Sequence, residues 1–92
     1  MADNFITMYA TATCPFCVAA RNLLRSKKVD WEEVSIAGEP EKRAEMIARS
    51  GRRTVPQIFI GDQHVGGFDD LRALDEEGAL DTMLARAGVD RQ

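Results

Sequence analysis

Ninety-two residues, 45% of them hydrophobic and 29% charged, have the composition of one small globular domain and not of a disordered chain. Twelve basic and fifteen acidic residues give a net charge of −3, which excludes the strongly basic surface typical of nucleic-acid-binding proteins. No apolar run approaches the ~18 residues of a membrane-spanning helix, and residues 1–4 lack the features of a secretory signal, so we expect a cytoplasmic protein with no membrane partner.

The first predicted elements are a strand over residues 5–9 and a helix from Pro15 to about Lys27. The strand is rich in β-branched and aromatic residues. Pro15 suits the first helical position, where its missing N–H is not needed. Lys27 and Lys28 would meet the negative end of the helix.

The rest of the chain predicts three more strands and three more helices. Pro40 opens the second helix, which Gly51 can end, and Gly61-Asp62 is a two-residue connection typical of a tight hairpin. In chain order these elements are a strand at 31–36, a helix at 39–50, strands at 57–60 and 63–65, and helices at 69–76 and 79–87, the last ended by Gly88. We therefore predict a single α/β domain over residues 1–92.

Cys14 and Cys17 are the only cysteines, and they lie where the first strand passes into the first helix. The first turn of a helix offers unpaired N–H groups and a partial positive charge, which favour a thiolate. Such a setting can bring a cysteine pKa from ~8.5 to roughly 3.5–7.5. The pattern predicts a thiol–disulfide redox site. Cys14, at the exposed helix end, should be the nucleophile, and the more buried Cys17 should resolve the mixed disulfide.

Other roles for the cysteines stay open at this stage. A buried structural pair is disfavoured by Pro15 and by the position at a helix start. A structural zinc site needs four ligands, and beyond the cysteines the chain offers only His64 and carboxylates, so we expect no metal. His64 is predicted to be a solvated hairpin residue without a catalytic role. Phe16 either shields the thiol, packs on a bound substrate or is simply partly buried.

Thr54-Val55-Pro56 is the second motif. A β-branched residue before a proline is compatible with a cis peptide, although local chemistry favours the commoner trans form. A cis turn would leave the N–H and C=O of Val55 available to pair with an extended peptide. A trans proline would simply open an edge strand.

Gly66-Gly67-Phe68-Asp69 is the third motif. Two glycines allow close backbone approach, and the helix start that follows offers N–H groups to an anion. Asp69 can cap that helix, and its carboxylate can also accept an ammonium group from a ligand.

Together the three motifs resemble a dithiol glutaredoxin from Phe5 to about Leu84. The resemblance is carried by Tyr9 at its spacing before residues 13–17 (TCPFC), by residues 52–60 (RRTVPQIFI) and by residues 64–71 (HVGGFDDL). It implies a thioredoxin-like fold, in which helices flank a four-stranded mixed sheet, and a cis Pro56. It also implies an oxidoreductase that uses glutathione as co-substrate to reduce protein–glutathione mixed disulfides and protein disulfides. We expect a monomer with no tightly bound cofactor.

The resemblance further implies a glutathione groove built from three segments. Its residues are Phe16 at the cysteinyl end, Thr54, Val55 and Pro56 along the peptide backbone, Gln57 near the glycine carboxylate, and Gly67, Phe68 and Asp69 around the γ-glutamyl end.

Two positions depart from the family pattern. Phe16 stands where Tyr is more common. Thr11, three residues before Cys14, stands where members commonly carry a Lys that would assist the thiolate and pair with a glutathione carboxylate. We hypothesise that Arg52, Arg53 or both supply the missing positive charge.

Two alternative functions keep the same fold. Two subunits and two glutathiones could hold a [2Fe-2S] cluster through Cys14, because thiolates suit iron, but Pro15 stands where cluster-carrying relatives usually have Gly. The dithiol could instead be reduced by thioredoxin reductase, although Asp69 and the glycine pair favour glutathione.

Overall fold

The computed structural model describes residues 6–86, which form eight elements in the predicted order. The predicted Phe5 start of the first strand, and the Ala87 end and Gly88 stop of the last helix, lie outside the described residues. The elements are β1 (Ile6–Ala10), α1 (Pro15–Ser26), β2 (Glu32–Ser35), α2 (Pro40–Ser50), β3 (Gln57–Ile60), β4 (Gln63–Gly66), α3 (Phe68–Glu77) and α4 (Ala79–Arg86).

The four strands form one mixed sheet in the order β2-β1-β3-β4. β1 runs parallel to β2, with Thr7 opposite Glu32, and antiparallel to β3, with Ile6 opposite Ile60. β3 and β4 are antiparallel neighbours joined by the hairpin predicted at residues 61–62. The sheet therefore has the mixed, four-stranded form predicted for a thioredoxin-like α/β fold.

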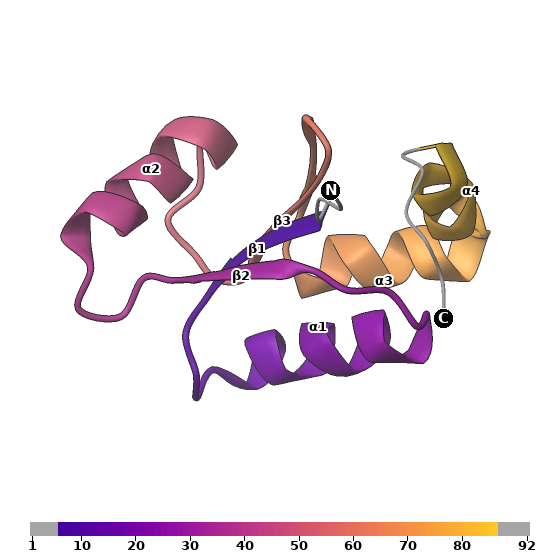
Figure 1. The fold of residues 1–92 in the computed structure, drawn as a ribbon, viewed down its shortest axis with the longest axis horizontal. Coiled ribbons are helices and arrows are strands. Elements are labelled where there is room, and N and C mark those ends of the chain that lie inside the picture. The colour runs from indigo at the N-terminus through magenta and orange to yellow at the C-terminus, as the bar shows by residue number, and fades with distance from the viewer. Residues whose placement is uncertain (1–5, 87–92) are drawn as a thin grey trace.

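Helices cover both faces of the sheet (Figure 1). α1 lies below the sheet in that view and packs against α3, and α2 lies on the other side of the sheet. Because successive side chains of a strand point to opposite faces of the sheet, the central strands contribute side chains to two separate hydrophobic cores. One core gathers around Met8, Leu24, Ile58 and Leu71, and the other around Tyr9, Met46 and Phe59.

The helix boundaries follow the expected local chemistry, with small differences. Pro15 and Pro40 begin α1 and α2, and Gly51 ends α2 in the left-handed conformation with φ 73°. β2 is shorter than the predicted strand at 31–36, and α3 begins at Phe68, one residue before the predicted start. None of the helices within residues 6–86 combines the length and the apolar character needed to cross a bilayer.

Buried Tyr9 anchors α2 to the sheet. Its hydroxyl donates to the carboxylate of Glu45 and accepts a hydrogen bond from Arg49 Nη1 at 2.8 Å. The Arg49 guanidinium also lies 4.2 Å from the centre of the Phe59 ring, a cation–π contact with β3. The C-terminal end of α2 is thus fixed against the sheet just before the segment that carries the Thr54-Val55-Pro56 motif.

Candidate active site

Cys14 lies at the N-terminal end of α1, directly before the first helical residue Pro15, and it is part-buried. The backbone N–H of Cys17 contributes most to lowering the pKa of the Cys14 thiol; burial opposes this, and the N–H of Phe16 lowers the pKa further. As a thiol the sulfur makes no capping hydrogen bond. As a thiolate it becomes an acceptor for these otherwise unpaired N–H groups, so the helix start favours the charged form.

Cys17 lies one turn further into α1 and is fully buried. Burial raises the pKa of its thiol, because removal from water disfavours the thiolate. The two sulfurs therefore differ in both access and acidity, and Cys14 ionises first. This asymmetry supports the predicted assignment of Cys14 as nucleophile and Cys17 as resolving thiol.

Arg21 is a cation whose charge favours the thiolate form of both cysteines, and the motifs in the sequence did not point to it. Its Nη2 donates to the carbonyl of Thr11 at 2.9 Å, and its guanidinium makes two bonds to the Glu33 carboxylate on β2, at 2.9 and 2.5 Å. The positive charge adds to the lowering of the pKa of Cys14. A spacing of seven residues from Cys14 along a helix places both side chains on one face, and this was the available signal.

The hypothesis that Arg52 or Arg53 replaces the missing Lys stays a prediction. Arg52 lines the groove described below, but its Nη1 lies 2.9 Å from Asp70 Oδ2, so its charge is already paired. Arg53 is exposed and lies outside the groove lining. Arg21 acts near the thiols although it too is paired with a carboxylate, that of Glu33, and Arg52 lines the groove.

The Val55–Pro56 peptide is cis, as the family resemblance implies and contrary to the local preference for trans. The turn brings the Val55 carbonyl to 4.0 Å from Cys14 Sγ. Within residues 6–86 no backbone hydrogen bond uses the N–H or C=O of Val55. The N–H is thus available to an extended peptide laid beside the nucleophile, and the C=O, whose one contact is the long bond from the Cys14 thiol, is available once that thiol is ionised.

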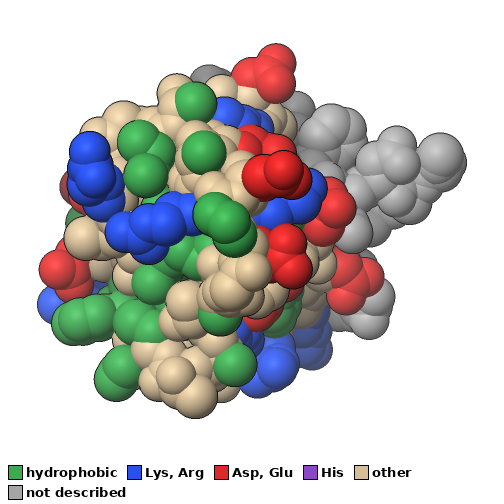
Figure 2. Space-filling view, turned by 90° about the vertical axis from the view of Figure 1, so that its left-hand side faces the viewer, with side chains coloured by type: hydrophobic (Ala, Val, Ile, Leu, Met, Phe, Trp, Pro, Cys, Tyr) green, Lys and Arg blue, Asp and Glu red, His purple; other side chains and the backbone are tan. Residues whose placement is uncertain are grey.

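A groove of about 310 Å³ opens beside this turn. It is lined by three segments far apart in the sequence: Phe16 of α1, residues 52 and 54–56 before β3, and residues 67–70 at the start of α3. Phe16 is 57% exposed, so it is a wall of the groove and not a core residue. Figure 2 shows the end of the molecule that carries the loop into α1, where hydrophobic and basic side chains are interspersed and acidic ones gather to the right.

The side of the groove formed by residues 67–70 depends on Asp70, which the sequence analysis did not single out. Its Oδ2 accepts a hydrogen bond from the Gly67 N–H at 3.0 Å and pairs with Arg52, and both contacts lower the pKa of this carboxyl. The prediction that Asp69 caps α3 is wrong, because the residue before the helix is Gly67 and the carboxylate that reaches back to it is Asp70. Asp69 is exposed and lines the groove.

Gly66 and Gly67 differ in what a side chain at each position would meet. Gly66 has φ +118°, and a Cβ there would lie 2.3 Å from Asp70 Oδ2. A Cβ on Gly67 would lie 3.4 Å from the Pro56 carbonyl, an ordinary van der Waals contact, so a side chain there would fill the gap between the two segments without straining the backbone. With its own N–H taken by Asp70, Gly67 leaves the N–H groups at the first positions of α3 for an anion.

Two predictions about β3 and β4 are corrected by the structure. Gln57 does not line the groove, because it is fully buried and its amide NH₂ donates to the Thr54 carbonyl at 3.0 Å. His64 is not a solvated hairpin residue. It is part-buried, its ring lies 5.0 Å from that of Phe59, and its Nε2 lies 2.7 Å from Gln57 Oε1.

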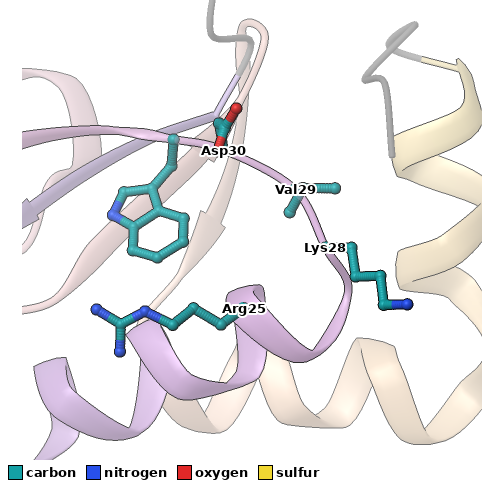
Figure 3. A pocket seen from close by; sticks show the side chains of 5 residues that line it. Arg25, Lys28, Val29 and Asp30 are labelled. Carbon is teal, nitrogen blue, oxygen red and sulfur yellow. The ribbon is translucent and has the colours of Figure 1, made fainter. Parts of the chain in front are cut away.

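A second hollow, of about 530 Å³, lies at the other end of α1, where residues 28–31 lead into β2. Figure 3 shows Arg25 and Lys28 pointing in different directions, so the two cations do not converge on one anion. Arg25 lies 5.9 Å from the Trp31 ring centre, and none of the lining residues is a cysteine or histidine. Residues 6–86 also contain no group of three or more His, Cys, Asp or Glu side chains placed to hold a metal ion. The thiol chemistry is therefore concentrated at Cys14, whose sulfur lies 4.0 Å from the carbonyl of Val55, a residue that lines the 310 Å³ groove.

Comparison with known proteins agrees with this geometry. The family model Glutaredoxin matches residues 6–65. The chain is 56% identical over 79 residues to Glutaredoxin 3 of Escherichia coli K12, an alignment that covers 86% of this chain and 95% of that protein. It is 50% identical over 80 residues to Glutaredoxin of Pseudomonas aeruginosa, covering 87% of this chain and 95% of that protein.

Solved structures show the same fold. The crystal structure of a buckwheat glutaredoxin–glutathione complex superposes with a TM-score of 0.85 at 26% identity, covering 92% of this chain and 80% of that one. The solution structure of glutaredoxin from Brucella melitensis superposes with a TM-score of 0.77 at 49% identity, covering 90% and 89% of the two chains.

Proposed function

The chain belongs to the glutaredoxin family and is a glutathione-dependent thiol–disulfide oxidoreductase, and we propose that the Cys14/Cys17 dithiol and the adjoining groove carry this activity. The observation that supports this most is the placement of the Cys14 sulfur. It lies at a helix start that favours the thiolate and 4.0 Å from the carbonyl of Val55, in a cis-proline turn where Val55 makes no backbone–backbone hydrogen bond.

Glutathione fits the groove by its chemistry. A similar protein has been solved as a glutathione complex. In this chain the tripeptide would extend along Val55 with its sulfur next to Cys14. Its γ-glutamyl carboxylate would accept hydrogen bonds from the first N–H groups of α3, and its ammonium group would meet the exposed Asp69. Arg52, although paired with Asp70, lines the groove and offers a positive charge to the remaining carboxylate.

Reduction of a protein–glutathione disulfide needs Cys14 alone. The Cys14 thiolate attacks the glutathione sulfur; a new S–S bond forms, and the protein sulfur leaves as a thiolate that takes up a proton. A second glutathione thiolate then attacks the bound glutathione sulfur, which releases glutathione disulfide and restores the Cys14 thiolate.

Reduction of a protein disulfide needs both cysteines. Cys14 attacks one sulfur of the disulfide and forms a mixed disulfide with the protein. Cys17 then loses its proton and attacks the Cys14 sulfur, so that the protein leaves as a dithiol and Cys14–Cys17 becomes the oxidised pair. Two glutathione molecules return this pair to the dithiol and are oxidised to one glutathione disulfide.

We also propose that the protein acts in the cytoplasm as a monomer. The proposal is supported by the need for a reducing compartment to keep the dithiol reduced, and by the fact that all three groove segments come from one chain. Its protein substrates would be glutathionylated or disulfide-containing proteins.

The test is a coupled assay in which glutathione, glutathione reductase and NADPH support turnover of a glutathionylated substrate. Cys14→Ser should abolish turnover, whereas Cys17→Ser should keep deglutathionylation and lose reduction of protein disulfides. Activity retained by Cys14→Ser would reject the assignment of the nucleophile. Turnover with thioredoxin reductase, but not with glutathione, would reject glutathione as the electron donor.

A further inference from the structure

The first residue of β3, Gln57, is a polar side chain buried directly beneath the cis-proline turn. It is fully inaccessible to solvent, and its Nε2 donates to the Thr54 carbonyl at 3.0 Å and lies 3.3 Å from the Thr54 hydroxyl. Both partners belong to the residue that precedes Val55 and Pro56. The amide therefore holds the turn from below, and it cannot reach a ligand in the groove without leaving its buried position.

His64 on β4 fixes the orientation of this amide. Since the NH₂ group of Gln57 faces the Thr54 oxygens, its Oε1 faces His64 Nε2, 2.7 Å away, and this ring nitrogen must carry the proton. Burial and the nearby Arg52 lower the pKa of His64, so the ring is neutral near pH 7. The tilted contact with Phe59, at 5.0 Å between ring centres, keeps the imidazole in this position.

We propose that Gln57 and His64 act together as a positioning pair that sets the Thr54-Val55-Pro56 turn for glutathione and for Cys14, and that neither side chain touches the substrate. The proposal rests on the proposed function, because it concerns the same groove. The connection is continuous. His64 orients Gln57, Gln57 holds the Thr54 carbonyl, and the next carbonyl along the chain, that of Val55, lies 4.0 Å from Cys14 Sγ.

The pairing makes a specific prediction about loss of either member. His64→Phe keeps a ring against Phe59 but leaves Gln57 Oε1 buried without a donor, a state that proteins avoid. The amide would then rotate or shift, and the Thr54 carbonyl would lose its partner. Gln57→Met keeps a similar side-chain shape and removes the same bond directly. Both changes release the turn in the same way, so the double variant should show no larger effect than either single variant.

The decisive experiment compares two substrates. One is a mixed disulfide with glutathione, and the other is the same protein linked to γ-glutamylcysteine, which lacks the glycine carboxylate. A positioning pair raises KM by the same factor for both, and we expect threefold or more in Gln57→Met and in His64→Phe, with no further increase in the double variant. The exposed neighbour Gln63→Ala is the matched control and should leave KM unchanged.

A second measurement does not depend on turnover. The NMR order parameter of the Val55 amide should be lower in both variants than in the wild-type protein and in Gln63→Ala, because a released turn moves more. A KM increase confined to the glutathione substrate would overturn the proposal in favour of direct contact with the glycine carboxylate. A wild-type KM together with a wild-type Val55 order parameter in His64→Phe would overturn it as well. Absence of glutathione-dependent turnover in the wild-type protein would instead reject the proposed function.

Discussion

Replacing Asp70 with Ala should destabilise the protein, while the same change at neighbouring Asp69 should affect binding. Asp70 accepts a hydrogen bond from the Gly67 N–H at 3.0 Å and pairs with Arg52 at 2.9 Å. A hydrogen bond to a charged group contributes about 1.5–3 kcal/mol. Because the Asp70 side chain is 45% exposed, solvent screening reduces this contribution, and the Arg52 pair adds only about 0.2–1 kcal/mol.

We therefore expect Asp70→Ala to lower the free energy of unfolding by about 1–2 kcal/mol. For a domain of this size, that loss lowers Tm by roughly 4–16 °C. Asp69→Ala is the matched control, since it also replaces a first-turn acid of α3 with Ala but breaks no contact with Gly67 or Arg52. It should keep the wild-type Tm and raise KM for the glutathionylated substrate.

The assay is thermal and urea denaturation of both variants, followed by steady-state kinetics below Tm. The pH dependence adds a check with a defined sign. Arg52 and the Gly67 N–H hold the pKa of Asp70 below its usual value. A carboxyl of this kind stabilises the fold above its unfolded pKa of ~3.9, and the stabilisation is lost as pH falls through the folded pKa. The difference in the free energy of unfolding between the wild-type protein and Asp70→Ala should be constant from about pH 5 to 8 and become smaller below about pH 4. Equal Tm values for the two variants at pH 7 would refute the role given to Asp70.

The remaining predictions concern the cation near the thiols and the paired glycines. Arg21→Gln should raise the pKa of Cys14, which would be measured as slower alkylation at pH 6. Arg21→Lys should largely preserve this pKa, and Arg53→Ala should leave it unchanged. A wild-type alkylation rate in Arg21→Gln would show that the Arg21 charge does not act on the thiolate. Gly66→Ala should cost on the order of 1–3 kcal/mol in unfolding free energy, because its φ of +118° strains any side chain and its Cβ would displace Asp70. Gly67→Ala, measured in parallel, should keep the fold and raise KM by narrowing the gap to the Pro56 carbonyl, so equal stability losses at the two glycines would contradict the separate reasons given for them.

The fold could be predicted from the sequence because its signals are local and mutually consistent. Pro15, Pro40 and Gly51 mark helix ends by backbone chemistry, and the hairpin at residues 61–62 has the composition of a tight turn. The roles of the cysteines followed from their place at a helix start. The cis form of Pro56 did not follow from local chemistry, which favours trans, and it entered only through the family resemblance.

The contacts around the site that the sequence analysis missed are made between elements distant along the chain. Arg21 reaches back to Thr11 and across to β2, Arg52 meets Asp70 from 18 residues away, and His64 meets Gln57 across a hairpin. The family resemblance placed Gln57, which follows Pro56 in the sequence, in the groove near the glycine carboxylate. Strand alternation and burial turn that side chain away from the groove and toward His64.

The central claim is that the start of α1 makes Cys14 a thiolate near neutral pH, and the pH dependence of its alkylation tests this most directly. In the Cys17→Ser variant, which leaves Cys14 as the only thiol, the rate of reaction with iodoacetamide should rise with a midpoint clearly below that of the same variant unfolded in guanidinium chloride, where an ordinary cysteine titrates near ~8.5. Coincident midpoints in the folded and unfolded protein, or a higher midpoint in the folded protein, would contradict the account.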